Sequence, residues 1–293
     1  MAERTNGQIW VAILIAVVLG GFVGWAGSDG GNVYNEIPVF AICAALAYGV
    51  NWLVFLPSAA AKTEKFYDLT GGTTYLTVIA VAVVLSSGLD LRGQLVAAAV
   101  AVWALRLASF LFMRISKDGK DGRFDNIKSR PARFLMAWTL QGLWVLLTAG
   151  AALAVITGGN QKPLGVVGII GFAVWAFGWG IEVISDRQKS KWRENPENQG
   201  KFIDVGLWSW SRHPNYFGEI VLWLGIAIVA FPVLKGWQYV TLISPVFVAF
   251  LLTKVSGVPL LEQRSDEKWG GQEDYEAYKA RTSVLMLKPP SGG

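Results

Sequence analysis

The stretch IWVAILIAVVLGGFVGW, residues 9–25, contains no charged residue. A helix of about 20 apolar residues crosses the roughly 30 Å hydrocarbon core of a bilayer, and it satisfies its own backbone groups where no water is available. Arg4 is the one basic residue before this stretch, so the strongly basic start of a secretory signal is missing. We therefore interpret this stretch as the first membrane-spanning helix.

The composition of the 293 residues supports a membrane protein. Hydrophobic residues make up 53% of the chain and charged residues 16%, with a mean hydropathy of +0.41. Soluble domains carry about 25% charged residues. Apolar segments of spanning length fall at about 8–27, 36–60, 73–89, 94–113, 134–157, 164–184, 216–233 and 237–254. The sequence predicts an all-α membrane bundle of seven to eight spans within one domain, 1–293, the lower number applying if one weak segment is re-entrant.

The basic residues are distributed unevenly between the predicted loops. With the N-terminus inside, the inner loops at 61–72, 114–133 and 185–215 carry two, seven and six Lys or Arg residues, and the tail after Lys254 carries five. The outer loops carry Arg92, Lys162 and Lys235. Because inner loops are enriched in Lys and Arg, we expect both termini in the cytoplasm and the inner loops to form a cytoplasmic cap.

Several kinds of site are not expected. One histidine and one distant cysteine, Cys43, cannot build an ordinary zinc site, and a single cysteine allows no disulfide within the chain. No P-loop or nucleotide-binding glycine pattern follows a strand, and Gly178 and Gly180 lie in a membrane segment where close helix packing explains them. The basic loops alternate with acidic residues and contain no nucleic-acid motif, which suits loops close to anionic lipid. We expect no metal, no nucleic acid and no protein partner.

The single histidine, His213, lies in SRHPNYFGE, residues 211–219, where the seventh predicted span begins. Pro214 favours an extended backbone at His213, which lets His213 and Asn215 point towards a ligand. Tyr216 and Glu219 are about one helical turn apart, and an ionisable group entering a membrane segment is a functional hypothesis by default. An interfacial ion pair between Glu219 and Arg212 is the alternative.

Cationic side chains precede this motif in two loops. Arg187, Lys189, Lys191 and Arg193 follow Asp186 at the end of the sixth span, and a second group lies after the fourth span, at Arg114, Lys117, Lys120, Arg123, Lys128 and Arg130. Arginine and lysine suit phosphate groups, so two such loops could hold a polyanionic cofactor such as a dinucleotide. Loops that only set the topology are the alternative.

A third polar group lies in KTEKFYDLTGG, residues 62–72, before the third predicted span. Glu64, Tyr67 and Asp68 have spacings of three and four, which predicts one helical face. A buried carboxyl has a raised pKa and can donate a hydrogen bond at neutral pH, and a tyrosine can donate without any shift. Alternatively, Asp68 or Thr70 caps the next helix.

The motif SRHPNYFGE with its preceding GLW turn, together with Asp186-Arg187 about thirty residues earlier, resembles the steroid 5-alpha-reductase superfamily, above all its bacterial integral-membrane members. The resemblance covers roughly residues 60–290 and includes the tail LLEQRSDEKWGGQEDYEAYKARTSVLML. It implies an NADPH-dependent enzyme of the bacterial inner membrane that reduces a carbon–carbon double bond conjugated to a ketone. The positions implied to contact the cofactor are Asp186, Arg193, Asn215 and Glu219, with His213 and Tyr216 by likeness to sterol reductases, Arg114 in its loop, and Glu262.

The substrate end departs from the family pattern. Mammalian members carry a Gln-Glu pair and a separate tyrosine around the substrate carbonyl, whereas here Glu64 or Asp68 is the counterpart of the glutamate, and Trp103 stands where the tyrosine is expected. Tyr67 then takes the role of that tyrosine. A donor at the carbonyl stabilises the enolate that forms when hydride reaches the β carbon.

Three functions remain open. The first is reduction of a flat lipophilic enone such as a 3-oxo-4-ene steroid. The second is an S-adenosylmethionine-dependent membrane methyltransferase of the isoprenylcysteine type, which uses a similar Arg-His-Pro turn but needs no phosphate-binding cations. The third is a non-catalytic membrane scaffold. The partners expected under the first are a lipophilic small molecule and membrane lipid.

Overall fold

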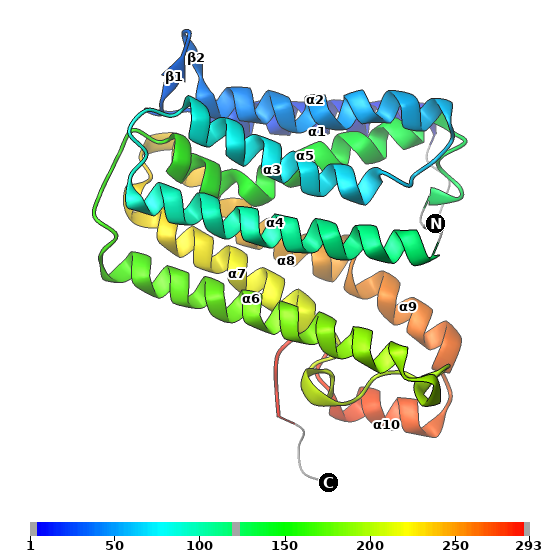
Figure 1. Ribbon diagram of the computed structural model, residues 1–293. Coiled ribbons are helices and arrows are strands. Elements are labelled where there is room, and N and C mark those ends of the chain that lie inside the picture. The colour runs from blue at the N-terminus through cyan, green and yellow to red at the C-terminus, as the bar shows by residue number, and fades with distance from the viewer. Residues whose placement is uncertain (1–4, 119–123, 290–293) are drawn as a thin grey trace. The chain divides into compact units, whose positions relative to one another are not determined.

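The structure is a computed structural model that describes residues 5–118 and 124–289, with the side chains of 110–112 and 114–118 left out of the description. Within these residues the regular secondary structure is almost entirely helical, and eight segments are long and apolar enough to cross a membrane (Figure 1). The prediction of an all-α membrane bundle is confirmed. The chain forms two compact units, which are described in turn.

The first unit comprises Met1–Gly168 together with Val229–Ser244. Its helices lie side by side in Figure 1: α1 (Asn6–Gly27), α2 (Val39–Ala60), α3 (Tyr67–Leu85), α4 (Leu91–Asp118) and α5 (Pro131–Thr157). A two-stranded antiparallel hairpin, β1 (Val33–Tyr34) and β2 (Ile37–Pro38), joins α1 to α2. Short 3₁₀ turns at Phe231–Val233 and Gly236–Leu242 complete this unit.

Helix α5 is the core of the first unit. It packs against α1, α2, α3 and α4, and most of its length is buried. Its sequence is apolar on every side, with small residues such as Ala149, Gly150 and Ala151 that let its neighbours approach. A helix that is apolar all round is stable where protein or lipid covers every face.

Helix α3 begins at Tyr67, earlier than the predicted start at 73. Phe66 is the residue at its N-cap, so the expectation that Asp68 or Thr70 caps this helix is wrong. Asp68 instead lies in the first turn, where a carboxylate interacts favourably with the helix dipole. Glu64 precedes the helix in a non-helical turn, so the predicted single helical face does not include Glu64.

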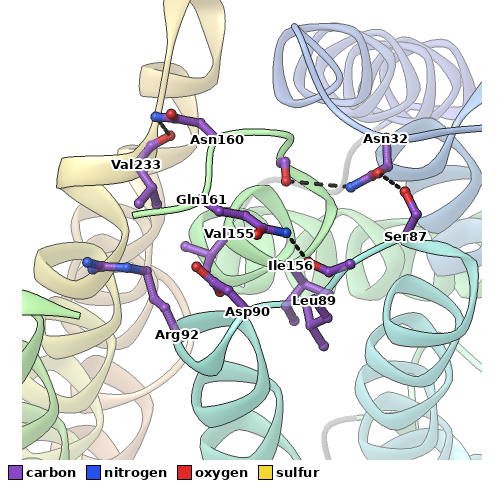
Figure 2. A pocket seen from close by; sticks show the side chains of 12 residues that line it. Asn32, Ser87, Leu89, Asp90, Arg92, Val155, Ile156, Asn160, Gln161 and Val233 are labelled. Atoms are coloured by element: carbon purple, nitrogen blue, oxygen red, sulfur yellow. Dashed lines mark hydrogen bonds between the residues drawn. The ribbon is translucent and has the colours of Figure 1, made fainter. Parts of the chain in front are cut away.

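A small pocket lies beside the connection between α3 and α4, at the opposite end of α3 from Glu64. It contains about 270 Å³ of empty space (Figure 2). Its charged lining residues are Asp90 and Arg92. The Arg92 guanidinium is buried and donates to three carbonyl oxygens, those of Val229 at 2.6 Å, Pro163 at 2.8 Å and Leu164 at 2.9 Å. Arg92 therefore ties chain segments together and is not an exposed outer-loop residue.

The second unit comprises Ile169–Ile228 and Pro245–Gly293. It contains most of α6 (Gly165–Glu194) and α7 (Pro214–Ala230), and it continues from α8 (Ile243–Phe250) through a π-helical turn, Leu251–Val255, into α9 (Val258–Trp269) and α10 (Glu273–Arg281). Two 3₁₀ turns, Pro196–Asn198 and Gly206–Ser209, lie in the loop between α6 and α7.

Glycines bring the backbones of α6 and α7 into contact. A Cβ at Gly218 would lie 2.6 Å from Gly178 O and 2.7 Å from Glu182 N. Gly178 lies equally close to the α7 backbone at Leu222, so its predicted packing role is confirmed, whereas a Cβ at Gly180 would meet no atom within 4 Å. The contact places the C-terminal half of α6 directly against the first turns of α7.

Candidate functional site

Asp186 of α6 and Asn215 of α7 form a hydrogen bond across this helix contact. Asn215 Nδ2 donates to Asp186 Oδ1 at 3.2 Å, and Asp186 is buried. Because Pro214 starts α7, Asn215 is in its first turn and faces the last third of α6. The two residues, 29 positions apart, were both predicted to contact a cofactor, and the structure brings them together.

Arg212, His213 and Glu262 form a second group. Glu262 of α9 lies with Oε1 2.7 Å from His213 Nε2 and Oε2 2.8 Å from Arg212 Nη2. The sequence singled out His213 and Glu262 but assigned Arg212 no ligand role. Arginine on one oxygen keeps the carboxylate ionised, so the other oxygen accepts a hydrogen bond from the imidazole.

The charge of His213 follows from its surroundings. Burial lowers the pKa of His213 below its ordinary value, and the hydrogen bond to Glu262 only partly offsets this effect. The imidazole is therefore neutral at pH 7. With Nε2–H donating to Glu262, Nδ1 carries the lone pair and can accept a hydrogen bond.

Three buried atoms of this site have no hydrogen-bond partner among the residues that the structure describes. They are His213 Nδ1 and Asn215 Oδ1, which accept, and Arg212 Nε, which donates. Leaving a buried polar group unsatisfied costs about 1–3 kcal/mol, so such atoms are rare in finished cores. Three within four consecutive residues fit a site that binds a polar ligand with both donors and acceptors.

The loop before α7 is fixed to α6 and to the end of the chain. Trp208 Nε1 donates to Ser185 O at 3.0 Å, and Leu207 N donates to Gln188 Oε1 at 3.0 Å. The Tyr278 hydroxyl donates to Trp208 O at 2.7 Å. The buried Ser211 hydroxyl accepts from His213 N at 3.1 Å and donates to Leu285 O at 2.9 Å. The turn that carries His213 is therefore positioned by side chains from three separate segments.

Tyr216 and Glu219 extend the site along α7. The Tyr216 ring stacks on the His213 imidazole, with centroids 5.7 Å apart and planes 10° apart. Glu219 is half-buried one turn further on, on the side of α7 that carries Asn215, because a spacing of four residues returns to the same face. Both lie in α7 with the spacing that the sequence predicted.

Glu182 is a site residue that the sequence analysis did not select. It is buried, lies one turn before Asp186 on the same face of α6, and its backbone contacts Gly218. A carboxyl inside a membrane span, four residues before a candidate ligand, was the signal that could have identified it.

The predicted phosphate-binding cations lie at the end of α6. Arg193 is seven residues after Asp186 and shares its face, whereas Arg187 and Lys191 share a neighbouring face four residues apart. All three are exposed. Arg114 and Lys117 lie in α4, but their side chains are outside the description, and Lys120 and Arg123 lie outside the described residues.

The predicted carbonyl-binding residues belong to the first unit. Glu64 is buried and forms an ion pair with Lys128 at 3.0 Å. The hydrogen bond from Lys128 to Glu64 raises the pKa of Lys128. The Tyr67 hydroxyl donates to Ala137 O at 3.0 Å and its ring packs against Phe124 and Trp138. Glu64 and Tyr67 are therefore close, since Tyr67 N also bonds to Glu64 O at 2.8 Å.

Comparison with known proteins gives one family match. A family model described as "Protein of unknown function (DUF1295)" matches residues 54–282. This range includes the Asp186–Asn215 pair, the group of Arg212, His213 and Glu262, and the predicted carbonyl-binding residues.

One curated relative is similar over part of its length. The chain is 30% identical over 118 residues to "3-oxo-5-alpha-steroid 4-dehydrogenase 1" from Rattus norvegicus. This alignment covers 40% of each protein, so the chain spans well under half of that relative. No solved structure matches. The similarity supports a distant relationship to this steroid 4-dehydrogenase.

Proposed function

The chain belongs to the DUF1295 family, and we propose that this member is an NADPH-dependent membrane oxidoreductase. Its proposed substrate is a lipophilic enone, such as a 3-oxo-4-ene steroid, whose conjugated carbon–carbon double bond it reduces. The similarity to the rat steroid 4-dehydrogenase supports this reaction class.

One observation carries the proposal. Arg212, His213 and Asn215 present three buried polar atoms that have no partner within the described part of the chain, beside the acidic residues Asp186 and Glu262. Two acceptors and one donor suit the hydroxyl and amide groups of a dinucleotide. The exposed cations at the end of α6, the helix that carries Asp186, suit its phosphates.

Each residue has a defined part in holding the cofactor. Asp186 orients the Asn215 amide so that its oxygen accepts from the ligand, and Glu262 orients the His213 ring so that Nδ1 accepts. Tyr216 covers one face of the imidazole, and Glu219 supplies a further acceptor on the same helix. Arg187, Lys191 and Arg193 bind phosphate oxygens. NADPH, when bound, supplies the hydride.

The substrate end is assigned to Tyr67, Glu64 and Asp68. The ion pair with Lys128 favours the ionised form of Glu64, which accepts hydrogen bonds and does not donate them. Tyr67 is therefore the proposed donor to the ketone oxygen. Its present acceptor is the neutral carbonyl of Ala137, and a developing oxyanion binds an O–H more strongly than a neutral carbonyl does. One preorganised donor of this kind is worth about 3–4 kcal/mol in the transition state.

The first test is ligand-dependent stability of the detergent-purified protein. NADPH at about 100 times its Kd should raise the free energy of unfolding by roughly 2.7 kcal/mol, seen as a higher melting temperature. NADH and S-adenosylmethionine are compared in parallel. Stabilisation by S-adenosylmethionine alone would replace the reductase with the methyltransferase, and stabilisation by none would favour a scaffold.

Matched variants make the test specific to the site. Asn215→Ala should abolish the NADPH effect, whereas Asn198→Ala, which removes an amide that donates to Trp192 O in the α6–α7 loop, should retain it. Turnover is then followed as loss of NADPH absorbance on addition of a 3-oxo-4-ene steroid, with Tyr67→Phe as the variant that should bind NADPH and lose activity.

The proposed location is the bacterial inner membrane with both termini in the cytoplasm. The excess of Lys and Arg in the loops after α2, α4 and α6 supports this orientation. Membrane lipid and the lipophilic substrate are the proposed partners, without nucleic acid or a protein subunit. Protease accessibility of the region after α9 in sealed inverted vesicles tests the orientation.

A further inference from the structure

The residues at 283–288, here called the tail segment, run alongside the loop that enters α7. Arg212 N donates to Ser283 O at 2.8 Å, and Lys288 N donates to Trp210 O at 3.0 Å. The Ser211 hydroxyl donates to Leu285 O at 2.9 Å. Three hydrogen bonds over six residues hold the segment, which bends at 284–286, against residues 210–212.

The two sides of the tail segment are both apolar. Leu285 and Leu287 are half-buried, and they alternate with Val284 and Met286, which are 40% and 55% exposed. Trp210, to which the segment is bonded, is 40% exposed. The exposed fractions place Val284 and Met286 at the surface of the protein, whereas Leu285 and Leu287 are more closely covered by it.

The start of α7 indicates the depth of the tail segment relative to the membrane. A membrane-spanning stretch begins at Pro214, two residues after Arg212, whose backbone bonds to Ser283. The tail segment therefore lies where a span meets the headgroup layer. Tryptophan favours this layer, and the exposed Lys288 beside it can reach lipid phosphates while its stem stays with the apolar side chains.

We propose that Trp210, Val284 and Met286 form a docking surface for the bilayer itself, and that the tail segment is embedded in the interfacial region of the leaflet at the start of α7. A second copy of the chain fits less well. Three side chains offer far less than the roughly 800 Å² per partner of a standard protein interface, and two copies would bring the cationic neighbours Arg281 and Lys288 together.

The test measures the environment of single spin labels in the full chain, reconstituted in lipid vesicles containing anionic lipid. The background is Cys43→Ala, since Cys43 is the one native cysteine. Labels are placed by Val284→Cys and Met286→Cys. Controls in the same unit are Ile184→Cys, 49% exposed within the α6 span, and Glu273→Cys on the exposed side of α10.

The readout is the ratio of collision with oxygen, which enters lipid, to collision with a water-soluble nickel chelate. Labels at 284 and 286 should resemble the label at 184, with oxygen dominant. A ratio like that at 273 would overturn the proposal, because the surface would then face water. Low collision with both reagents would also overturn it, because protein would then cover the surface. NADPH binding is not needed for this measurement, so its result is independent of the proposed reaction.

Discussion

Glu262 Oε1 lies 2.7 Å from His213 Nε2, and 49 residues separate the two in the chain. This contact decides which imidazole nitrogen carries the proton, and it leaves His213 Nδ1 buried as an acceptor. The candidate site is therefore made by α9 as much as by the motif that precedes α7.

The pKa of His213 should be observable directly, because it is the one histidine of the chain. Burial lowers this pKa in the folded state from an ordinary value of about 6.5. The unfolded chain therefore binds the proton more readily, so His213 contributes stability above about pH 6.5 that is lost as the pH falls towards its folded pKa. Histidine ring resonances against pH give the value.

Two variants check the cause. Glu262→Gln removes the charge that favours imidazolium, so the His213 pKa should fall further. His213→Gln should reduce the difference between the melting temperatures at pH 7.5 and at pH 5.5, because the variant has no imidazole to take up a proton on unfolding. A His213 pKa above the ordinary value would contradict the burial argument.

Gly218→Ala should weaken both the fold and the proposed cofactor site. The added Cβ would lie 2.6 Å from Gly178 O, which forces α6 and α7 apart and separates Asn215 from Asp186. Overpacking of this kind costs about 1–3 kcal/mol. The melting temperature should fall and stabilisation by NADPH should be lost.

Gly180→Ala is the matched control for this prediction. No atom lies within 4 Å of a Cβ at this position, and alanine favours a helix over glycine by about 0.5–1 kcal/mol. This variant should keep or raise the melting temperature. Equal losses in both variants would show that the glycine contact does not position the site.

Ser211→Ala should loosen the turn that carries His213. The variant leaves His213 N without its buried acceptor and Leu285 O without its donor, at a cost of about 1–3 kcal/mol. Ser209→Ala is the control, because its hydroxyl donates locally to Gly206 O near the surface. Titrations with NADPH should show weaker binding for the first variant alone, at a temperature where both are folded.

Lys128→Met should destabilise the first unit more than the double variant Lys128→Met/Glu64→Gln does. Removing the lysine takes the ion-pair partner from a buried carboxylate, whereas the second change also removes the negative charge. The expected difference is about 1–3 kcal/mol. Lys65→Met, at an exposed position in the same turn, is the control. Additive effects of the two changes in a double-mutant cycle would rule out the coupling.

The predicted helical spacing of the residues at the start of α7 agrees with the structure. Asn215, Tyr216 and Glu219 share α7 as their spacing requires, because helical periodicity acts over a few residues. At 62–72 the same argument placed Glu64 on a helix that begins only at Tyr67. Periodicity alone cannot say where a helix starts, since that depends on packing of the residues beyond it.

The sequence by itself determined that this protein folds as membrane-spanning helices. Runs of apolar residues long enough to cross a bilayer predict helices, because backbone groups must be satisfied internally in lipid, and this physical requirement needs no knowledge of neighbours. The tertiary structure alone decided the partners of the polar residues. The contacts join residues that are 49 to 74 positions apart: Lys128 with Glu64, Glu262 with His213, and Leu285 with Ser211. Arg92 bonds to Val229, which is 137 positions away in the chain. Contacts of this kind depend on how helices pack, and no periodicity in the chain encodes which side chains meet.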